Sequence, residues 1–208
     1  MTADLIPYVL AAYLFFVTIF ISLRAILIYI KARNPRLLIL SVSMGVIALT
    51  AAADFGSMTF TNGTLNTNWF LYIGQAVSLL FILLSLLGNS DGYLRGLMVV
   101  HVCCSALLFG LLLFSPSLPD FPSVALRAGL SISRSFLCFG IFFCYVFAFF
   151  KKETRFSFMM GLSFLLLALG YLLIVQKYFV ATPDMFDHLG DITRMVSLTV
   201  LLITMLIG

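Results

Sequence analysis

Seven runs of apolar residues, each about as long as a lipid bilayer is thick, occupy most of this sequence of 208 residues. Crossing a hydrocarbon core of about 30 Å takes roughly 20 residues in a helix, and each run approaches or exceeds that length. The sequence therefore predicts an all-α, polytopic membrane protein, a single domain over 1–208 built as a bundle of seven transmembrane helices. The predicted spans are 5–29, 37–58, 69–87, 93–114, 123–150, 156–175 and 189–207.

The composition makes lipid the solvent for most of the surface. Hydrophobic residues make up 62% of the chain and charged residues 10%, whereas a soluble domain carries about 25% charged residues. Backbone groups cannot stay unpaired in lipid, and the alternating pattern of β-barrel strands is absent, so the runs are predicted to be helices. The net charge of +4 sits mostly in short loops, so we expect the lipid bilayer as a partner and no nucleic acid.

The basic residues divide unevenly between the two sets of loops. One set, which faces inward if the N-terminus lies outside, holds Lys31, Arg33, Arg36, Arg95, Lys151, Lys152 and Arg155. The opposite set holds Lys177, with Arg127 near a helix end. Because cytoplasmic loops carry an excess of lysine and arginine, we expect the N-terminus outside and the C-terminus in the cytoplasm.

A polar stripe runs down the predicted fifth span. Arg127, Ser131 and Arg134 recur at helical spacing and so lie on one face of the helix. Arg134 is about 10 Å deeper than Arg127 by helical rise. Ionisable groups inside a membrane are costly, so this face is expected to turn toward the interior of the bundle.

Polar residues of three other spans lie at a similar depth. The seventh span opens with His188, Asp191 and Arg194, the second carries Asp54 near its outer end, and the third carries Gln75. These positions predict an outward-opening polar cavity or an ion-pair network among the second, third, fifth and seventh spans. The candidate ligand-binding residues are Asp54, Gln75, Arg127, Ser131, Arg134, His188, Asp191 and Arg194.

Arg134 allows two interpretations that do not exclude each other. It could form an interhelical ion pair with Asp54 or Asp191, because an unpaired charge is expensive in lipid. Alternatively, the arginines clamp the carboxylate of a small anionic or amphiphilic ligand, since a guanidinium presents a planar fork of donors. His188 could titrate near neutral pH, or it could simply cap a helix.

Histidine and cysteine spacing gives little sign of a cofactor. His101, in the middle of the fourth span, is a candidate haem ligand. The chain has one other histidine, His188, which is near the outer surface, so a shared iron is awkward. The four cysteines show no CxxC or zinc-type spacing. We expect no metal, no cofactor and no catalytic site, because no catalytic arrangement of residues lies at one depth.

The order of seven helices with short loops and an outer N-terminus resembles a known family, the N-terminal seven-helix membrane sensor modules of prokaryotic histidine kinases and related signalling proteins. The segments 161–171, GLSFLLLALGY, and 189–194, LGDITR, carry the resemblance best. In that family the seventh span leads into a cytoplasmic output domain, which this sequence does not include. The resemblance implies a sensing role in a prokaryotic plasma (inner) membrane, without kinase activity of its own.

The resulting expectation is a membrane-embedded sensory or ligand-binding module, not an enzyme, with an outward-facing polar cavity. It would signal through a cytoplasmic partner or a missing output domain, by a shift of the fifth or seventh helix. The alternative is a non-catalytic accessory or anchoring subunit of a larger complex with other membrane or cytoplasmic subunits. A small transporter or channel is the third possibility, although the lack of a visible internal repeat argues against it.

Overall fold

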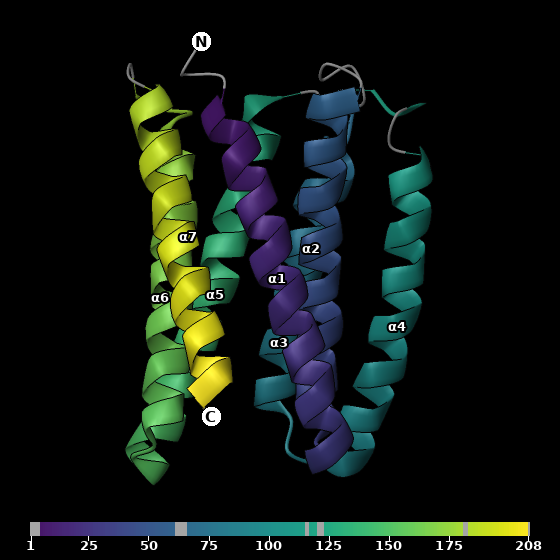
Figure 1. Ribbon diagram of the computed structural model, residues 1–208, viewed down its shortest axis with the longest axis vertical. Helices are drawn as coiled ribbons and strands as arrows, with labels where there is room; N and C mark the ends of the chain where they lie inside the picture. Colours follow the sequence, from purple (N-terminus) through teal and green to yellow (C-terminus); the bar gives the residue numbers. More distant parts are fainter. Residues whose placement is uncertain (1–4, 61–65, 115–116, 120–122, 181–182, 208) are drawn as a thin grey trace.

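The computed structural model describes residues 5–60, 66–114, 117–119, 123–180 and 183–207, which form seven long helices (Figure 1). These described residues contain no strand, which confirms the predicted all-helical fold. The helices are α1 (Leu5–Ala32), α2 (Pro35–Phe60), α3 (Asn68–Leu87), α4 (Asp91–Phe114), α5 (Val124–Lys152), α6 (Arg155–Gln176) and α7 (Pro183–Ile207).

All seven helices are long and apolar enough to cross a membrane. The shortest candidate span, in α3, has 20 residues and the longest, in α5, has 29. At about 1.5 Å per residue these lengths match the hydrocarbon core. Large apolar side chains cover the outside of the bundle: Phe16, Leu107 and Phe136 are 66%, 75% and 70% exposed. Such a surface suits lipid and not water.

Six of the helices form a closed ring, and α4 lies outside it. Around the ring α1 packs on α2, α2 on α3, α3 on α5, α5 on α6, α6 on α7, and α7 back on α1. Within the described residues, α4 contacts only α2 and α3, and it stands at one edge of the bundle in Figure 1. Its buried residues Leu94, His101 and Leu108 are seven positions apart, so one narrow face of α4 meets the ring.

The bundle has two ends, which we call the N-terminal end and the C-terminal end. The N-terminal end carries the start of α1 and the connections after α2, α4 and α6, and the C-terminal end carries the other connections and the end of α7 (Figure 1). At the C-terminal end, Arg33 and Glu153 adopt left-handed φ angles of 53° and 48°. Their amides donate to the carbonyl oxygens of Tyr29 and Phe149 at 2.7 and 2.6 Å, which ends α1 and α5 in tight turns.

An apolar core fills the middle of the ring. Met44, Leu79, Ile141 and Phe164 come from α2, α3, α5 and α6, and each is at most 1% exposed. They belong to one cluster that also includes buried residues of α1 and α7. The core therefore separates the two ends of the ring.

α6 and α7 cross closely at two glycines. A Cβ atom added to Gly170 would lie 3.0 Å from the carbonyl oxygen of Gly190, and one added to Gly190 would lie 2.8 Å from the carbonyl oxygen of Gly170. Small residues permit such close approach of two helix backbones. The crossing holds the Arg194 side chain against α6, with its Cγ 2.7 Å from the position of a Gly170 Cβ.

The largest difference from the predicted helix bounds is at the start of α7. This helix begins at Pro183, six residues before the predicted start at 189, and every other predicted bound lies within three residues of the observed one. Proline suits the first helical turn because its missing N–H would have no partner there. The first two turns also carry Asp187 and His188, so an apolar run does not reveal them.

Trp69, the single tryptophan of the chain, ties α3 to segment 117–119 at the N-terminal end. Its indole N–H donates to the carbonyl oxygen of Pro119 at 2.8 Å. The neighbouring Asn66 amide donates to the carbonyl oxygen of Leu118 at 3.2 Å. These two bonds hold segment 117–119 against the start of α3.

Candidate functional site

A cavity of about 290 Å³ opens at the N-terminal end of the ring, and all six ring helices or the residues next to them line it. We call it the Arg134 cavity. The residues of α1 in its lining are all apolar. The charged and polar lining residues come from the other five ring helices and the residues next to them. Its polar lining consists of Asp54, Tyr72, Gln75, Arg134, Lys177, Asp187, His188, Asp191 and Arg194.

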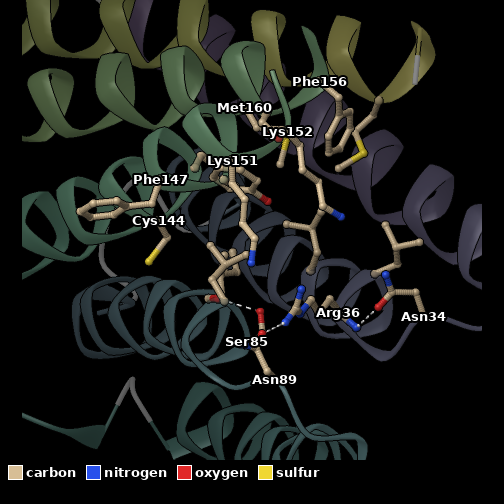
Figure 2. A pocket seen from close by; sticks show the side chains of 18 residues that line it. Asn34, Arg36, Ser85, Asn89, Cys144, Phe147, Lys151, Lys152, Phe156 and Met160 are labelled. Carbon is tan, nitrogen blue, oxygen red and sulfur yellow. Dashed lines mark hydrogen bonds between the residues drawn. The ribbon is translucent and has the colours of Figure 1, made fainter. Parts of the chain in front are cut away.

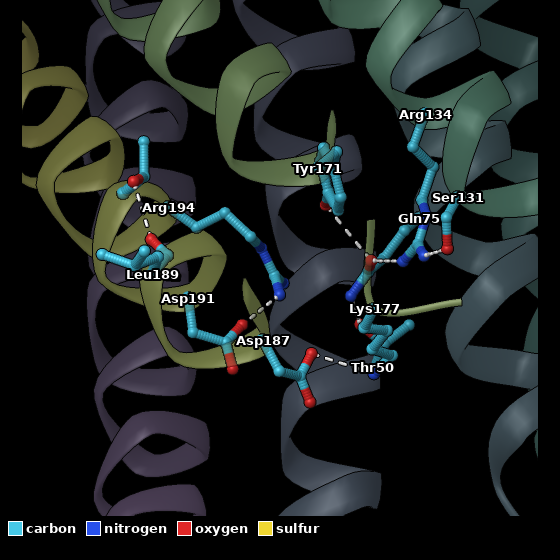
Figure 3. A network of polar contacts seen from close by, with 11 residues as sticks. Thr50, Gln75, Ser131, Arg134, Tyr171, Lys177, Asp187, Leu189, Asp191 and Arg194 are labelled. Carbon is cyan, nitrogen blue, oxygen red and sulfur yellow. Dashed lines mark hydrogen bonds and ion pairs between the residues drawn. The ribbon is translucent and has the colours of Figure 1, made fainter. Parts of the chain in front are cut away.

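Gln75 and Arg134 form the buried centre of a polar network (Figure 3). Arg134 is 4% exposed and donates to Gln75 Oε1 at 2.5 Å and to Ser131 Oγ at 2.9 Å. Gln75 Oε1 also accepts a hydrogen bond from the Tyr171 hydroxyl at 3.2 Å. The Gln75 amide nitrogen donates to Thr50 Oγ1 at 3.3 Å. Four helices, α2, α3, α5 and α6, therefore meet at one amide.

Tyrosine rings flank both arginines. The Arg134 guanidinium carbon lies 4.5 Å from the ring centre of Tyr72 and 4.7 Å from that of Tyr171. The Arg194 guanidinium carbon lies 4.9 Å from the Tyr171 ring centre. A desolvated contact of this kind is worth about 2 kcal/mol. At the cavity rim, burial raises the pKa of Tyr178, whose hydroxyl lies 3.1 Å from that of Tyr72.

Two ion pairs involve most of the other charged side chains that line the cavity. Arg194 Nη1 donates to Asp191 Oδ1 at 2.8 Å within α7, and Lys177 Nζ donates to Asp187 Oδ1 at 2.9 Å. Asp191 pairs with Arg194 because the two lie three residues apart on one helix face. Among the described residues, no carboxylate forms an ion pair with Arg134. The ion pair that the sequence offered, Arg134 with Asp54 or Asp191, is absent from the described network.

Several polar atoms of the site have no partner within the described part of the chain. The Nε atoms of Arg134 and Arg194 are buried there without a hydrogen bond. The half-buried carboxylate of Asp54 lines the cavity and forms no hydrogen bond or ion pair with another described residue. An unsatisfied buried donor costs about 1–3 kcal/mol. Among the described residues, the site therefore holds two buried donors without a partner, and the cavity lining holds a carboxylate without one.

The structure brings most of the ligand-binding candidates from the sequence together in the cavity lining. These include Asp54, Gln75, Arg134, Asp191 and Arg194.

His188 also lines the cavity and is exposed at its mouth. Ser131 is fully buried and touches the site through its hydrogen bond from Arg134. Arg127 is on α5 closer to the helix start and is not among the lining residues. Of the two arginines on the α5 stripe, Arg134 therefore lines the cavity and Arg127 does not.

Tyr72 and Tyr171 are site residues that the sequence candidates did not include. Their phenol rings cover Arg134, and the Lys177–Asp187 pair closes one side of the cavity. The sequence did contain a signal for these two residues: each is a tyrosine within an apolar run, at about the same depth in the membrane as an arginine of another span. An amphipathic ring in that position is a natural partner for a buried cation.

His101, the haem-ligand candidate, lies away from the Arg134 cavity. It is 1% exposed on α4, stacks on Phe81 with ring centres 4.2 Å apart, and has its Nε2 atom 3.4 Å from Ser43 Oγ. In the described residues, α4 does not contact α7, so the fold does not bring His101 to His188. The contacts are those of a histidine packed between helices.

No protein-family model, curated protein or solved structure matches this chain. The resemblance to sensor modules of histidine kinases therefore stays a prediction, and the geometry of the Arg134 cavity carries the functional argument.

Proposed function

We propose that the chain is a membrane-embedded sensory module that binds a small, anion-bearing ligand in the Arg134 cavity. The excess of basic residues at the C-terminal end favours an orientation in which the cavity opens to the outside. The resemblance to sensor modules favours a prokaryotic plasma membrane. The cavity volume, about 290 Å³, suits a ligand smaller than most drug-sized molecules.

The observation that carries the proposal is the burial of Arg134 without a counter-charge. The residue is 4% exposed and lacks a carboxylate partner among the described residues. Gln75, Ser131 and the two tyrosine rings stabilise the cation but do not neutralise it. A buried charge without a counter-charge is strongly unfavourable. A ligand carboxylate in the cavity would supply that charge.

Asp54 narrows the class of ligand. Its carboxylate lines the same cavity without an ion pair to a described residue. A ligand with an anionic group for Arg134 and an ammonium group for Asp54 would satisfy both. We therefore favour a small zwitterion, such as an amino acid, over a simple anion.

α7 is the element best suited to pass on the binding event. It contributes Asp191 and Arg194 to the cavity and runs from there to the C-terminal end. A ligand that binds one position of α7 better than another would shift the population toward it. A cytoplasmic partner or output domain would read that shift.

Thermal unfolding of the detergent-solubilised protein tests the proposal, with a panel of carboxylates, amino acids and amphiphilic anions. A fitting compound at 100 times its Kd should stabilise the wild type by about 2.7 kcal/mol. Arg134→Gln should lose this stabilisation. Arg127→Gln is the matched control, because it removes the same charge from the same helix outside the cavity lining.

Asp54→Asn separates the two parts of the proposal. It should weaken stabilisation by amino acids and leave the response to plain carboxylates of equal size unchanged. If no compound stabilises the wild type while Arg134→Gln is strongly destabilised, the arginine is structural and the sensory proposal fails.

A non-catalytic accessory subunit is the second candidate function. The position of α4 favours it, because this helix lies outside the ring and presents large exposed residues such as Leu107 and Phe109. A neighbouring subunit could cover that side as well as lipid does. Co-purification of a defined membrane partner, lost on substitution of Leu107 by a charged residue, would support this function.

A further inference from the structure

A second and larger cavity, of about 530 Å³, opens at the C-terminal end of the ring (Figure 2). Residues of α2, α3, α5, α6 and α7 line it, and it shares no lining residue with the Arg134 cavity. The apolar core of the ring lies between the two. We call this second space the basic cavity.

The charged side chains of the basic cavity have one sign. Arg36, Lys151 and Lys152 line it, and no acidic side chain is among its lining residues. None of the three forms an ion pair with a described residue. Figure 2 shows Lys151 extending from α5 toward Arg36 of α2, with Asn89 beside them. Two helices that both pack on α3 thus direct positive charge into one space.

Arg36 is held in place but keeps a free donor. Its Nη2 atom donates to the carbonyl oxygen of Gly88 at 2.9 Å and to Asn89 Oδ1 at 2.8 Å. Its Nε atom is buried and has no hydrogen-bond partner in the described part of the chain. A guanidinium fixed by two hydrogen bonds, with a flexible ammonium in the same cavity lining, matches an oxyanion with several acceptor oxygens.

The surroundings of the basic cavity indicate where that anion comes from. Phe147 is part of the lining and is 73% exposed, so the cavity reaches the apolar outer surface of the bundle. Phe156, also in the lining, is 39% exposed. A ligand with a phosphate and an attached acyl chain fits this combination. Basic pockets between transmembrane helices are typical binding sites for anionic lipid headgroups.

We propose that the basic cavity binds a phosphate group through Arg36 and Lys151, and that an anionic phospholipid supplies it. Met205, in the last turns of α7, lines the same cavity. An occupied cavity would therefore hold α7 against α2 and α5 at the C-terminal end. This proposal does not depend on what binds in the Arg134 cavity.

The test uses the full chain, purified in a neutral detergent and mixed with defined lipids. Phosphatidylglycerol should raise the Tm of the wild type by about 5 °C or more at saturation, and phosphatidylcholine should raise it much less. Native mass spectrometry should show phosphatidylglycerol retained preferentially. Lys151→Gln should lose most of both effects. Inorganic phosphate alone should give a smaller rise than the lipid, because it lacks the acyl chain.

Lys31→Gln and Arg155→Gln are the controls, since both remove a basic residue from the same end without touching the cavity lining. Arg36→Gln also breaks the bonds to Gly88 and Asn89, so Lys151→Gln is the decisive variant. Equal stabilisation of wild type and Lys151→Gln by phosphatidylglycerol would overturn the site. A full response to inorganic phosphate would overturn the lipid as its source.

Discussion

The side chain of Gln75 fixes its own orientation through its neighbours. Its oxygen accepts from Arg134 and Tyr171, and its nitrogen donates to Thr50. Two donors on one side and an acceptor on the other leave only one orientation of the amide. This neutral side chain therefore holds the Arg134 guanidinium without cancelling its charge.

Gln75→Glu should close the Arg134 cavity to anions. A carboxylate in place of the amide would pair with Arg134 and provide the counter-charge that a ligand otherwise brings. We expect the variant to unfold at a Tm equal to or above that of the wild type and to show no shift with carboxylates. Gln75→Leu, which removes the acceptor, should destabilise the protein by about 2 kcal/mol. A Gln75→Glu variant that still responds to carboxylates would rule out Arg134 as the anion site.

The crossing of α6 and α7 depends on the two glycines that bring the helix backbones together. Gly190→Ala should destabilise the protein by about 2 kcal/mol, because the new methyl group would overlap the α6 backbone. The distances involved are 2.8 Å to the Gly170 carbonyl oxygen and 3.1 Å to the Ile174 amide nitrogen. The measurement is the Tm in detergent, together with the response to carboxylates, since Arg194 leaves α7 one turn further on.

Gly129→Ala is the control for this crossing. Gly129 is in α5, and a Cβ atom there would meet nothing within 4 Å. Since alanine is the better helix former by about 1 kcal/mol, Gly129→Ala should be neutral or stabilising. Equal effects of the two substitutions would show that the α6–α7 crossing is not close-packed.

The sequence predicted the helices themselves better than it predicted which helices pack against one another. The seven helices follow from runs of apolar residues, and the α5 stripe follows from the spacing of Arg127, Ser131 and Arg134. The ring, with α4 outside, does not follow, because apolar helices of similar composition give no signal for which faces meet. The spacing of Arg127 and Arg134 gives their difference in depth, but the partners of Arg134 on α3 and α6 come only from the fold. Tyr171 was hidden in the same way, since its partner comes from another helix.

At the scale of the whole molecule, two cavities lie at opposite ends of one ring. Residues of α2, α3, α5, α6 and α7 line both the Arg134 cavity and the basic cavity. The core between them contains Leu79 and Phe164, each at most 1% exposed. Packed cores of this kind move between discrete arrangements and do not deform continuously. We therefore expect a ligand that shifts these helices at one end to alter the space at the other.

The orientation of the bundle can be measured directly. In a variant without the four native cysteines, Ser117→Cys and Glu153→Cys place one thiol at each end, both at exposed positions. Because the basic residues favour the C-terminal end inside, a membrane-impermeant maleimide should label Ser117→Cys on intact cells. Glu153→Cys should react only after permeabilisation. The reverse labelling would open the Arg134 cavity to the cytoplasm, and the sensory proposal would then require an intracellular ligand.

Trp69 gives the molecule an optical property that needs no added dye. The chain has one indole beside eight tyrosines, so its tryptophan emission comes from a single known place. That place is one helical turn from Tyr72, whose ring covers Arg134, and the indole is hydrogen-bonded to the segment after α4. Any rearrangement of α3 around an occupied site would alter the polarity around one fluorophore. Ligand titrations can therefore be followed by the wavelength of intrinsic emission from the unmodified protein.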